Sequence, residues 1–135
     1  MKAIVYKKYG APGVLQIEEI EKPVPRDDEV LIKIRAVEAT KGDCELRGFN
    51  FAVKWFWLPL RIAAGVTRPR KQVLGGYFAG EVEAIGKDVS KFRKGDQVFG
   101  TTGFQFGAYG EYLCLPGSAT IAPMPCNMSF EEAAA

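Results

Sequence analysis

Apolar and polar residues alternate along short segments of this chain, and turn residues separate the segments. The clearest alternation runs over residues 29–37, where Val30 and Ile32 fall on one face and Lys33 and Arg35 on the other. A period of two is typical of a half-buried β-strand. The same signals predict further strands over residues 2–7, 14–21, 80–85, 97–101, 109–115 and 119–122. Many short strands in succession predict a mainly β fold with short helices, arranged as a small, partly open β-barrel.

The period changes over residues 40–47, where we expect a short helix. Thr40 can cap its first turn, Asp43 lies early in the segment, and Gly48 follows as a stop signal. Asp43 and Arg47 are four residues apart, so they share one face of such a helix. The sequence therefore predicts an ion pair between them.

A second helix begins near the end of the sequence. Ser129 and Glu132 match a capping box, and three alanines follow before the sequence stops at Ala135. A helix of about seven residues is marginal in water by itself. We therefore interpret residues 129–135 as the start of a longer helix, and the chain as a fragment whose residues 1–128 form one domain.

The composition excludes several classes of protein and of chemistry. The chain has 135 residues, 47% of them hydrophobic and 25% charged, which is ordinary for a soluble globular domain. A net charge of +2 does not favour nucleic acid as a partner. Histidine is absent, which removes the commonest general base and the commonest zinc ligand. No apolar run approaches the roughly 20 residues of a membrane-spanning helix, so no membrane is expected as a partner.

The three cysteines predict a reducing environment. Cys44, Cys114 and Cys126 are odd in number and include no C-x-x-C pair. Such cysteines are typical of reduced thiols in a cytoplasmic protein. We expect Cys44 to be an ordinary packed thiol, because nothing in the sequence around it lowers the pKa of a cysteine.

The segment over residues 46–80 differs from the rest of the chain, because it contains no acid and many aromatic rings. Its cations are Arg47, Lys54, Arg61, Arg68, Arg70 and Lys71. Trp55, Phe56 and Trp57 follow one another, and they cannot all point into one core. We expect residues 49–71 to form a mobile, partly exposed wall of a substrate cleft. Packing under a second domain, a dimer interface and a membrane surface remain alternatives.

Two long segments resemble the medium-chain dehydrogenase/reductase superfamily. Residues 74–89 read LGGYFAGEVEAIGKDV and residues 92–99 read FRKGDQVF. In that superfamily, G-x-x-x-x-G-x-V-x-x-x-G and G-D-x-V belong to an N-terminal GroES-like barrel that covers a Rossmann cofactor domain. The start MKAIVY, the PVP and EVLI segments, GAYGEY and the final MSFEEAAA support the resemblance over nearly the whole chain.

The resemblance implies two domains, one for catalysis and substrate binding and one for cofactor binding. Residues 1–128 would be the GroES-like catalytic and substrate domain, and residues 129–135 would lead to a Rossmann domain that binds NAD(P). The chain itself contains no G-x-G-x-x-G fingerprint. The resemblance also allows a homodimer of the full-length protein. The alternative is a stand-alone GroES-like binding or interaction module without catalytic activity.

The departures from the zinc-dependent members predict the chemistry. Thr40 stands where those members have the Cys ligand, and Gly76 stands where they have His. What remains resembles the zinc-free quinone-oxidoreductase branch, which moves hydride from NADPH, or NADH, to quinones, enones or other carbonyls. The resemblance then implies Thr40 as a catalytic and cofactor-binding residue, with Asp43 and Tyr109 as further catalytic candidates. Trp55, Phe56 and Trp57 are the substrate-binding candidates.

Overall fold

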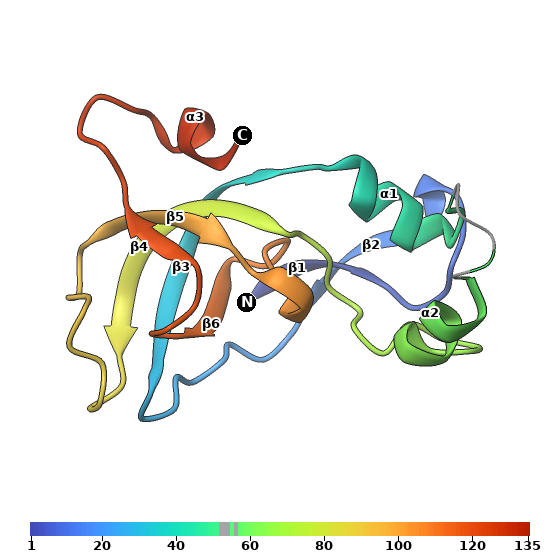
Figure 1. Cartoon of the computed structure of the whole chain (residues 1–135), viewed down its shortest axis with the longest axis horizontal. Helices are drawn as coiled ribbons and strands as arrows, with labels where there is room; N and C mark the ends of the chain where they lie inside the picture. Colours follow the sequence, from blue (N-terminus) through green and yellow to red (C-terminus); the bar gives the residue numbers. More distant parts are fainter. Residues whose placement is uncertain (52–54, 56) are drawn as a thin grey trace.

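The computed structural model describes residues 1–51, 55 and 57–135. Its strands form two antiparallel sheets (Figure 1). The smaller sheet pairs β1 (Lys2–Tyr6) with β2 (Leu15–Glu19). The larger sheet has the order β6-β3-β4-β5-β7, with bounds Tyr112–Pro116, Glu29–Glu38, Tyr77–Ile85, Gln97–Thr101 and Ile121–Pro123. The helices are α1 (Lys41–Gly48), α2 (Trp57–Ala64) and α3 (Phe130–Ala134), with short 3₁₀ turns η1 (Pro12–Val14) and η3 (Gly103–Gln105).

Residues 109–111 connect the two sheets. The Ile4 amide donates to the Tyr109 carbonyl at 2.9 Å, and the Glu111 amide donates to the Lys2 carbonyl at 3.1 Å. On the other side of this segment, the Ile34 amide donates to the Glu111 carbonyl at 2.9 Å. The segment therefore lies between β1 and β3 and joins the sheets into one curved surface that does not close. The expected mainly β, partly open fold is confirmed.

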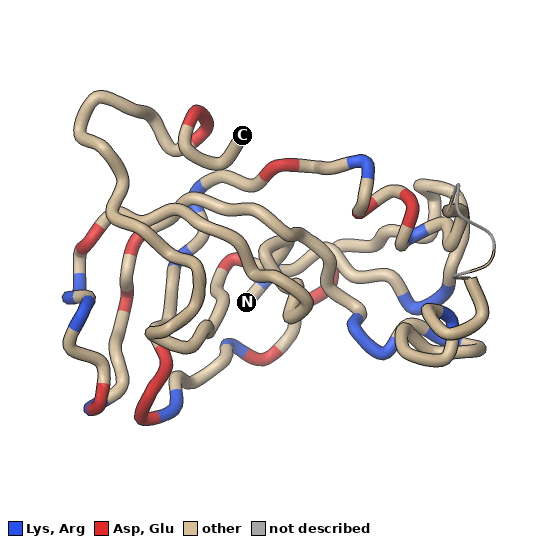
Figure 2. Tube along the Cα trace, viewed as in Figure 1, with Lys and Arg blue, Asp and Glu red and all other residues tan. Residues whose placement is uncertain are grey.

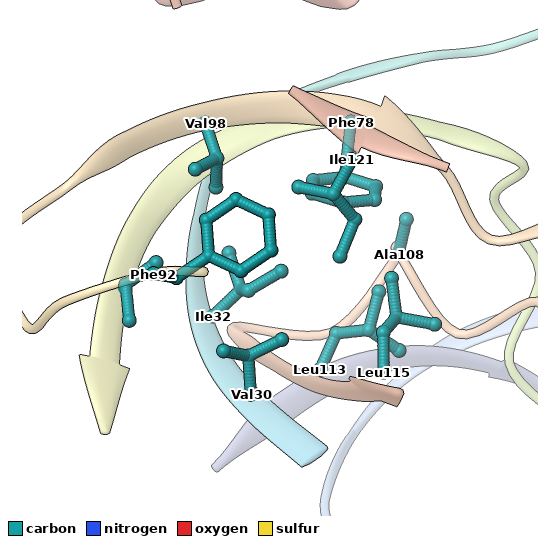
Figure 3. Close-up of a cluster of buried hydrophobic side chains, with 10 residues drawn as sticks. Val30, Ile32, Phe78, Phe92, Val98, Ala108, Leu113, Leu115 and Ile121 are labelled. Atoms are coloured by element: carbon teal, nitrogen blue, oxygen red, sulfur yellow. The ribbon is translucent and has the colours of Figure 1, made fainter. Parts of the chain in front are cut away.

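The main core fills the concave side of the larger sheet (Figure 3). Its buried members come from the five strands of this sheet and from two loops: Val30, Ile32, Phe78, Val82, Phe92, Val98, Ala108, Leu113, Leu115 and Ile121. Val30 and Ile32 are fully buried, as the alternation over residues 29–37 predicts. Burial of ten such side chains is the principal stabilising term of the fold.

Two of the family-like glycines are required by close backbone approach. A Cβ on Gly80 would overlap the Lys33 carbonyl oxygen of β3, and one on Gly86 would overlap the carbonyl oxygens of Arg26 and Asp27. A side chain at Gly80 would therefore push β4 away from β3, and one at Gly86 would displace the turn that precedes β3. This explains why the sequence has glycine at these two places.

Most predicted elements are present, with shifted ends. The strand predicted over residues 109–115 begins at Tyr112, because residues 109–111 bond to β1 instead. The strand predicted over residues 119–122 is Ile121–Pro123. Helix α2 is an addition that the sequence analysis did not predict, although Pro59 in its first turn and Gly65 after its end are ordinary helix boundaries. No helix in the described part of the chain is long and apolar enough to cross a bilayer.

Candidate functional site

The N-terminus of α1 carries a reciprocal capping box. The Thr40 hydroxyl oxygen accepts from the Asp43 amide at 3.1 Å, and Asp43 Oδ2 accepts from the Thr40 amide at 3.1 Å. The Thr40 hydroxyl also donates to Asp43 Oδ2 at 2.8 Å. The expectation that Thr40 caps this helix is confirmed.

Asp43 connects this helix to the segment before β4. Its side chain is buried, and its second oxygen, Oδ1, accepts from the Gly75 amide at 3.1 Å. Gly75 has a φ of +100°, which a residue with a side chain rarely adopts. One carboxylate thus joins two segments of backbone that lie more than thirty residues apart in the sequence.

Two tyrosines lie within the electrostatic reach of this carboxylate. Burial raises the pKa of Tyr109 far above its usual range, and the charge of Asp43 and its hydrogen bonding to the phenol raise the pKa further. Burial also raises the pKa of Tyr6 to about 12, with smaller contributions from Tyr9 and Asp43. The structure therefore brings together Thr40, Asp43 and Tyr109, the three catalytic candidates of the sequence analysis.

A glycine with free space around it completes this site. A Cβ on Gly76 would meet no atom within 4 Å, so this position faces open space. The Thr101 hydroxyl donates to the Gly76 carbonyl at 2.9 Å, and the buried Thr102 hydroxyl donates to the Gly75 carbonyl at 3.1 Å. Sequence reasoning did not identify Gly75, Thr101 or Thr102, because their role depends on backbone atoms that come together only in the folded chain.

Two expectations about α1 are wrong. Among the described residues, no ion pair joins Asp43 to Arg47, because both oxygens of Asp43 are used by Thr40 and Gly75. Arg47 instead donates from Nε to the Gly10 carbonyl at 3.3 Å. Cys44 is exposed rather than packed.

Trp57, the first residue of α2, lies at the end of a row of rings. Neighbouring rings in the row Tyr6, Tyr9, Phe49 and Trp57 have centroids 6.2, 5.1 and 5.7 Å apart. The exposed fractions of Trp55 and Trp57 are 81% and 44%, so the expectation that at least one ring is exposed is confirmed. Phe56 lies outside the described residues. The row connects Trp57 to Tyr6, whose pKa is affected by the charge of Asp43.

An open hollow of about 370 Å³ adjoins Tyr109. Its walls include Ile4 and Ile17 of the smaller sheet, and Ile34 and Val37 of β3. Such apolar walls near a buried polar cluster are typical of a surface that receives a small organic molecule or another apolar surface.

Zinc does not fit the donor atoms of this site. Thr40 supplies a neutral hydroxyl, and Gly76 supplies no side chain, whereas zinc in proteins is held by thiolate, imidazole and carboxylate groups. Within the described ranges, no three residues of the types His, Cys, Asp and Glu lie close enough together to hold a metal ion.

This topology and this capped helix define a class of protein domain. The chain belongs to the alcohol dehydrogenase GroES-like domain family, which matches residues 26–126. The resemblance to the N-terminal domain of medium-chain dehydrogenases/reductases is confirmed.

Among the proteins of this class, the chain is similar to several quinone oxidoreductases. The chain is 33% identical to the quinone oxidoreductase of Lama guanicoe over its whole length, and 34% identical to that of Pseudomonas aeruginosa over 99% of its length. It covers 37% and 36% of those proteins, respectively, so it spans little more than a third of the relatives it matches. The structure of the quinone oxidoreductase from Coxiella burnetii matches 99% of the chain, and 40% of that protein is covered, with a TM-score of 0.81 and 31% identity. A mycobacterial protein solved in complex with NADPH matches 99% of the chain, with 37% of that protein covered, a TM-score of 0.75 and 28% identity.

Proposed function

We propose that this chain is the substrate-side domain of an NAD(P)H-dependent oxidoreductase that transfers hydride to a quinone, an enone or another carbonyl compound without zinc. The quinone oxidoreductases among its relatives and the NADPH complex of a structural neighbour support this proposal. Residues 1–128 then form the catalytic domain, and residues 129–135 lead into a Rossmann domain. The three free cysteines are consistent with a cytoplasmic protein.

The observation that carries the proposal is the meeting of Thr40, Asp43 and Tyr109 beside Gly76. A nicotinamide cofactor supplies the hydride when it is bound. The residues of this domain then have to orient the cofactor's ring and the acceptor's oxygen. The open space at Gly76 leaves room for a flat ring next to these polar groups.

The hydrogen bonds of Thr40 limit what it can offer to a cofactor. Its hydroxyl has one hydrogen, which it donates to Asp43, and two lone pairs, one of which accepts from the Asp43 amide. One lone pair remains. Thr40 therefore acts as a hydrogen-bond acceptor, for the amide of the nicotinamide or for a ribose hydroxyl.

The raised pKa of Tyr109 limits its role in a similar way. Because burial and Asp43 hold the phenol in its neutral form, Tyr109 is a poor source of a released proton at neutral pH. In this structure the single hydrogen of the neutral phenol is directed to Asp43, so it reaches an acceptor only after it turns away from that carboxylate. We assign Tyr109 the task of polarising the acceptor's carbonyl, with Asp43 as the positioning residue that holds Thr40 and Gly75 in place.

The aromatic row supplies a wall for a flat acceptor. We propose that Trp57 forms part of this wall, together with Trp55 and Phe56 from the adjoining segment. Stacked and edge-on rings bind conjugated, planar molecules well. Replacement of Trp57 by alanine in the full-length enzyme should raise KM for bulky quinones more than for small ones.

Steady-state kinetics of the full-length enzyme test the proposal. With NADPH and a series of quinones and enones, we expect measurable turnover in metal-free buffer. Tyr109→Phe should lower kcat/KM by about 100-fold, because it removes one hydrogen bond to the developing oxyanion. Thr40→Ala should weaken cofactor binding, whereas Thr40→Ser keeps the hydroxyl and should retain it.

Two results would contradict the proposal. Turnover that disappears when zinc is removed, and returns with zinc, would show that the ligand positions are misassigned. A folded full-length protein that neither binds NADPH nor reduces any acceptor would favour the binding-module alternative.

A further inference from the structure

Helix α2 places its apolar residues toward solvent and its one cation toward the protein. Leu58 and Ile62 lie one turn apart and are 61% and 55% exposed, and Val66 just beyond the helix is 60% exposed. Arg61 is the only charged residue of the helix. This arrangement is the reverse of an ordinary surface helix, which turns its polar side to water.

Contacts with the protein explain why Arg61 faces inward. Its guanidinium lies 4.0 Å from the ring centroid of Tyr9 and 4.4 Å from that of Phe49. Its Nε also donates to the Val66 carbonyl at 2.9 Å. Cation–π contacts and this hydrogen bond satisfy the charge within the protein. The outward side of α2 therefore carries no charge of its own.

Hydrogen bonds fix α2 in this orientation. The Tyr9 hydroxyl donates to the carbonyls of Ala64 and Gly65, at 3.1 and 2.9 Å. The Arg70 amide also donates to the Ala64 carbonyl, at 2.9 Å. The chain after the helix is thus folded back against its C-terminal end. The basic residues that follow the helix are therefore held near its C-terminal end, and together with the apolar face they make up the α2 surface.

This surface is positively charged, and no acid belongs to it. Residues 46–80 contain no Asp or Glu, and Arg68, Arg70 and Lys71 are exposed. None of these three forms an ion pair with another described residue. Figure 2 shows blue segments without red around α2, whereas the opposite end of the molecule mixes both colours.

We propose that the outward face of α2, together with Arg68, Arg70 and Lys71, binds the surface of a bilayer that contains anionic lipids. Exposed aliphatic side chains suit the boundary between headgroups and acyl chains, and adjacent cations suit anionic headgroups. A second copy of the chain is a poorer occupant, because a two-fold contact through this surface would place like charges together. Nucleic acid is also poorer, because it would leave Leu58 and Ile62 without an apolar partner.

Co-sedimentation of the full-length protein with vesicles tests the proposal without cofactor or substrate, so its outcome is independent of the proposed hydride transfer. We expect binding to vesicles of phosphatidylcholine with about a third phosphatidylserine, and much weaker binding to phosphatidylcholine alone. The variant Arg68→Gln/Arg70→Gln/Lys71→Gln should lose about 100-fold in affinity, since each cation near an anionic surface contributes about a factor of five. Leu58→Ser/Ile62→Ser should also lose binding.

Matched variants outside α2 and the chain that follows it provide the controls. Lys87→Gln/Arg93→Gln/Lys94→Gln removes the same charge, and Ile17→Ser/Val24→Ser removes two exposed apolar side chains that are 75% and 82% exposed. Both control variants should bind as the parent does. The proposal is wrong if the parent binds both vesicles equally or not at all, or if the charge controls weaken binding as much as the test variants.

Two further readouts identify another occupant. A dimer in light scattering that Leu58→Ser/Ile62→Ser converts to monomer, without any vesicle binding, would assign the surface to a second copy. Binding of a duplex oligonucleotide in preference to anionic vesicles would assign it to nucleic acid. Either result would overturn the proposal.

Discussion

A single buried carboxylate, Asp43, organises the candidate site at the scale of individual residues. It accepts two hydrogen bonds from Thr40, one from the Gly75 amide and one from the Tyr109 phenol. Every one of these partners is a donor, so the site requires a group that only accepts. An ionised carboxylate meets this requirement, and an amide does not.

Replacement of Asp43 by Asn should therefore destabilise the fold. The new amide nitrogen would face a donor at either Gly75 or Thr40, which leaves a buried group unsatisfied and costs about 2 kcal/mol in the free energy of unfolding. Urea denaturation measures this cost. Asp27→Asn is the matched control, because Asp27 pairs with Lys87 at the surface and its side chain is 66% exposed. Equal stability of the two variants would contradict this account of Asp43.

The raised pKa of Tyr6 predicts a loss of stability in alkali. The unfolded chain releases this proton near pH 10, whereas the folded chain holds it up to about pH 12. The stabilisation is thus fully present below pH 10 and is lost as the pH rises toward 12. Tyr6→Phe should reduce the slope of unfolding free energy against pH in this range. Tyr77→Phe, at a half-exposed ring, controls for removal of a phenol, and an unchanged slope in Tyr6→Phe would refute the prediction.

At the scale of elements, close backbone approach decides where side chains are forbidden. Gly86 lies against the carbonyl oxygens of Arg26 and Asp27, just before β3. These backbone atoms cannot move without disrupting the turn that positions β3. The identity of this residue is therefore set by packing between elements.

Gly86→Ala should cost roughly 3 kcal/mol, as severe overpacking against backbone does. The matched control is Gly13→Ala, because a Cβ at Gly13 would meet no atom within 4 Å. Thermal and urea unfolding of both variants measure the difference. If Gly86→Ala is as stable as Gly13→Ala, the close approach is not a constraint on the fold.

The C-terminal end of α1 shows how packing between elements overrides a local signal. Gly48 was expected to stop this helix, but it is the last helical residue, and Phe49 adopts the left-handed conformation with a φ of +49°. That conformation costs a non-glycine residue about 1–2 kcal/mol. Phe49 is 7% exposed, and its ring packs against the rings of Tyr9 and Trp57 and the guanidinium of Arg61. Burial of the ring offsets the cost.

At the scale of the whole molecule, the proposed function divides cofactor binding between this domain and a further one. The chain covers little more than a third of its quinone oxidoreductase relatives and has no dinucleotide fingerprint. Residues 1–135 by themselves should therefore not bind NADPH in the micromolar range, because a glycine turn and a helix N-terminus usually hold its pyrophosphate. Calorimetric titration checks this, with the full-length protein as the positive control. Micromolar binding to the short chain would refute the two-domain proposal.

The sequence by itself determined the strands, the two capped helix starts and the family. These depend on neighbours in the chain: alternation over residues 29–37, Thr40 and Asp43 three residues apart, and Ser129 and Glu132 likewise. Gly80 and Gly86 could also be recognised from the sequence as structural positions, and the structure shows that close backbone approach excludes a side chain at both.

Only the tertiary structure decided which groups share the site and which face of α2 meets solvent. Sequence spacing favoured a pair between Asp43 and Arg47, but the amide of Gly75, brought in from a distant segment, occupies the second oxygen of Asp43. Likewise, Arg61 turns inward because Tyr9 and Phe49 lie there, which leaves Leu58 and Ile62 outside. In both cases, desolvation of a charge is acceptable only where distant parts of the chain supply its partners.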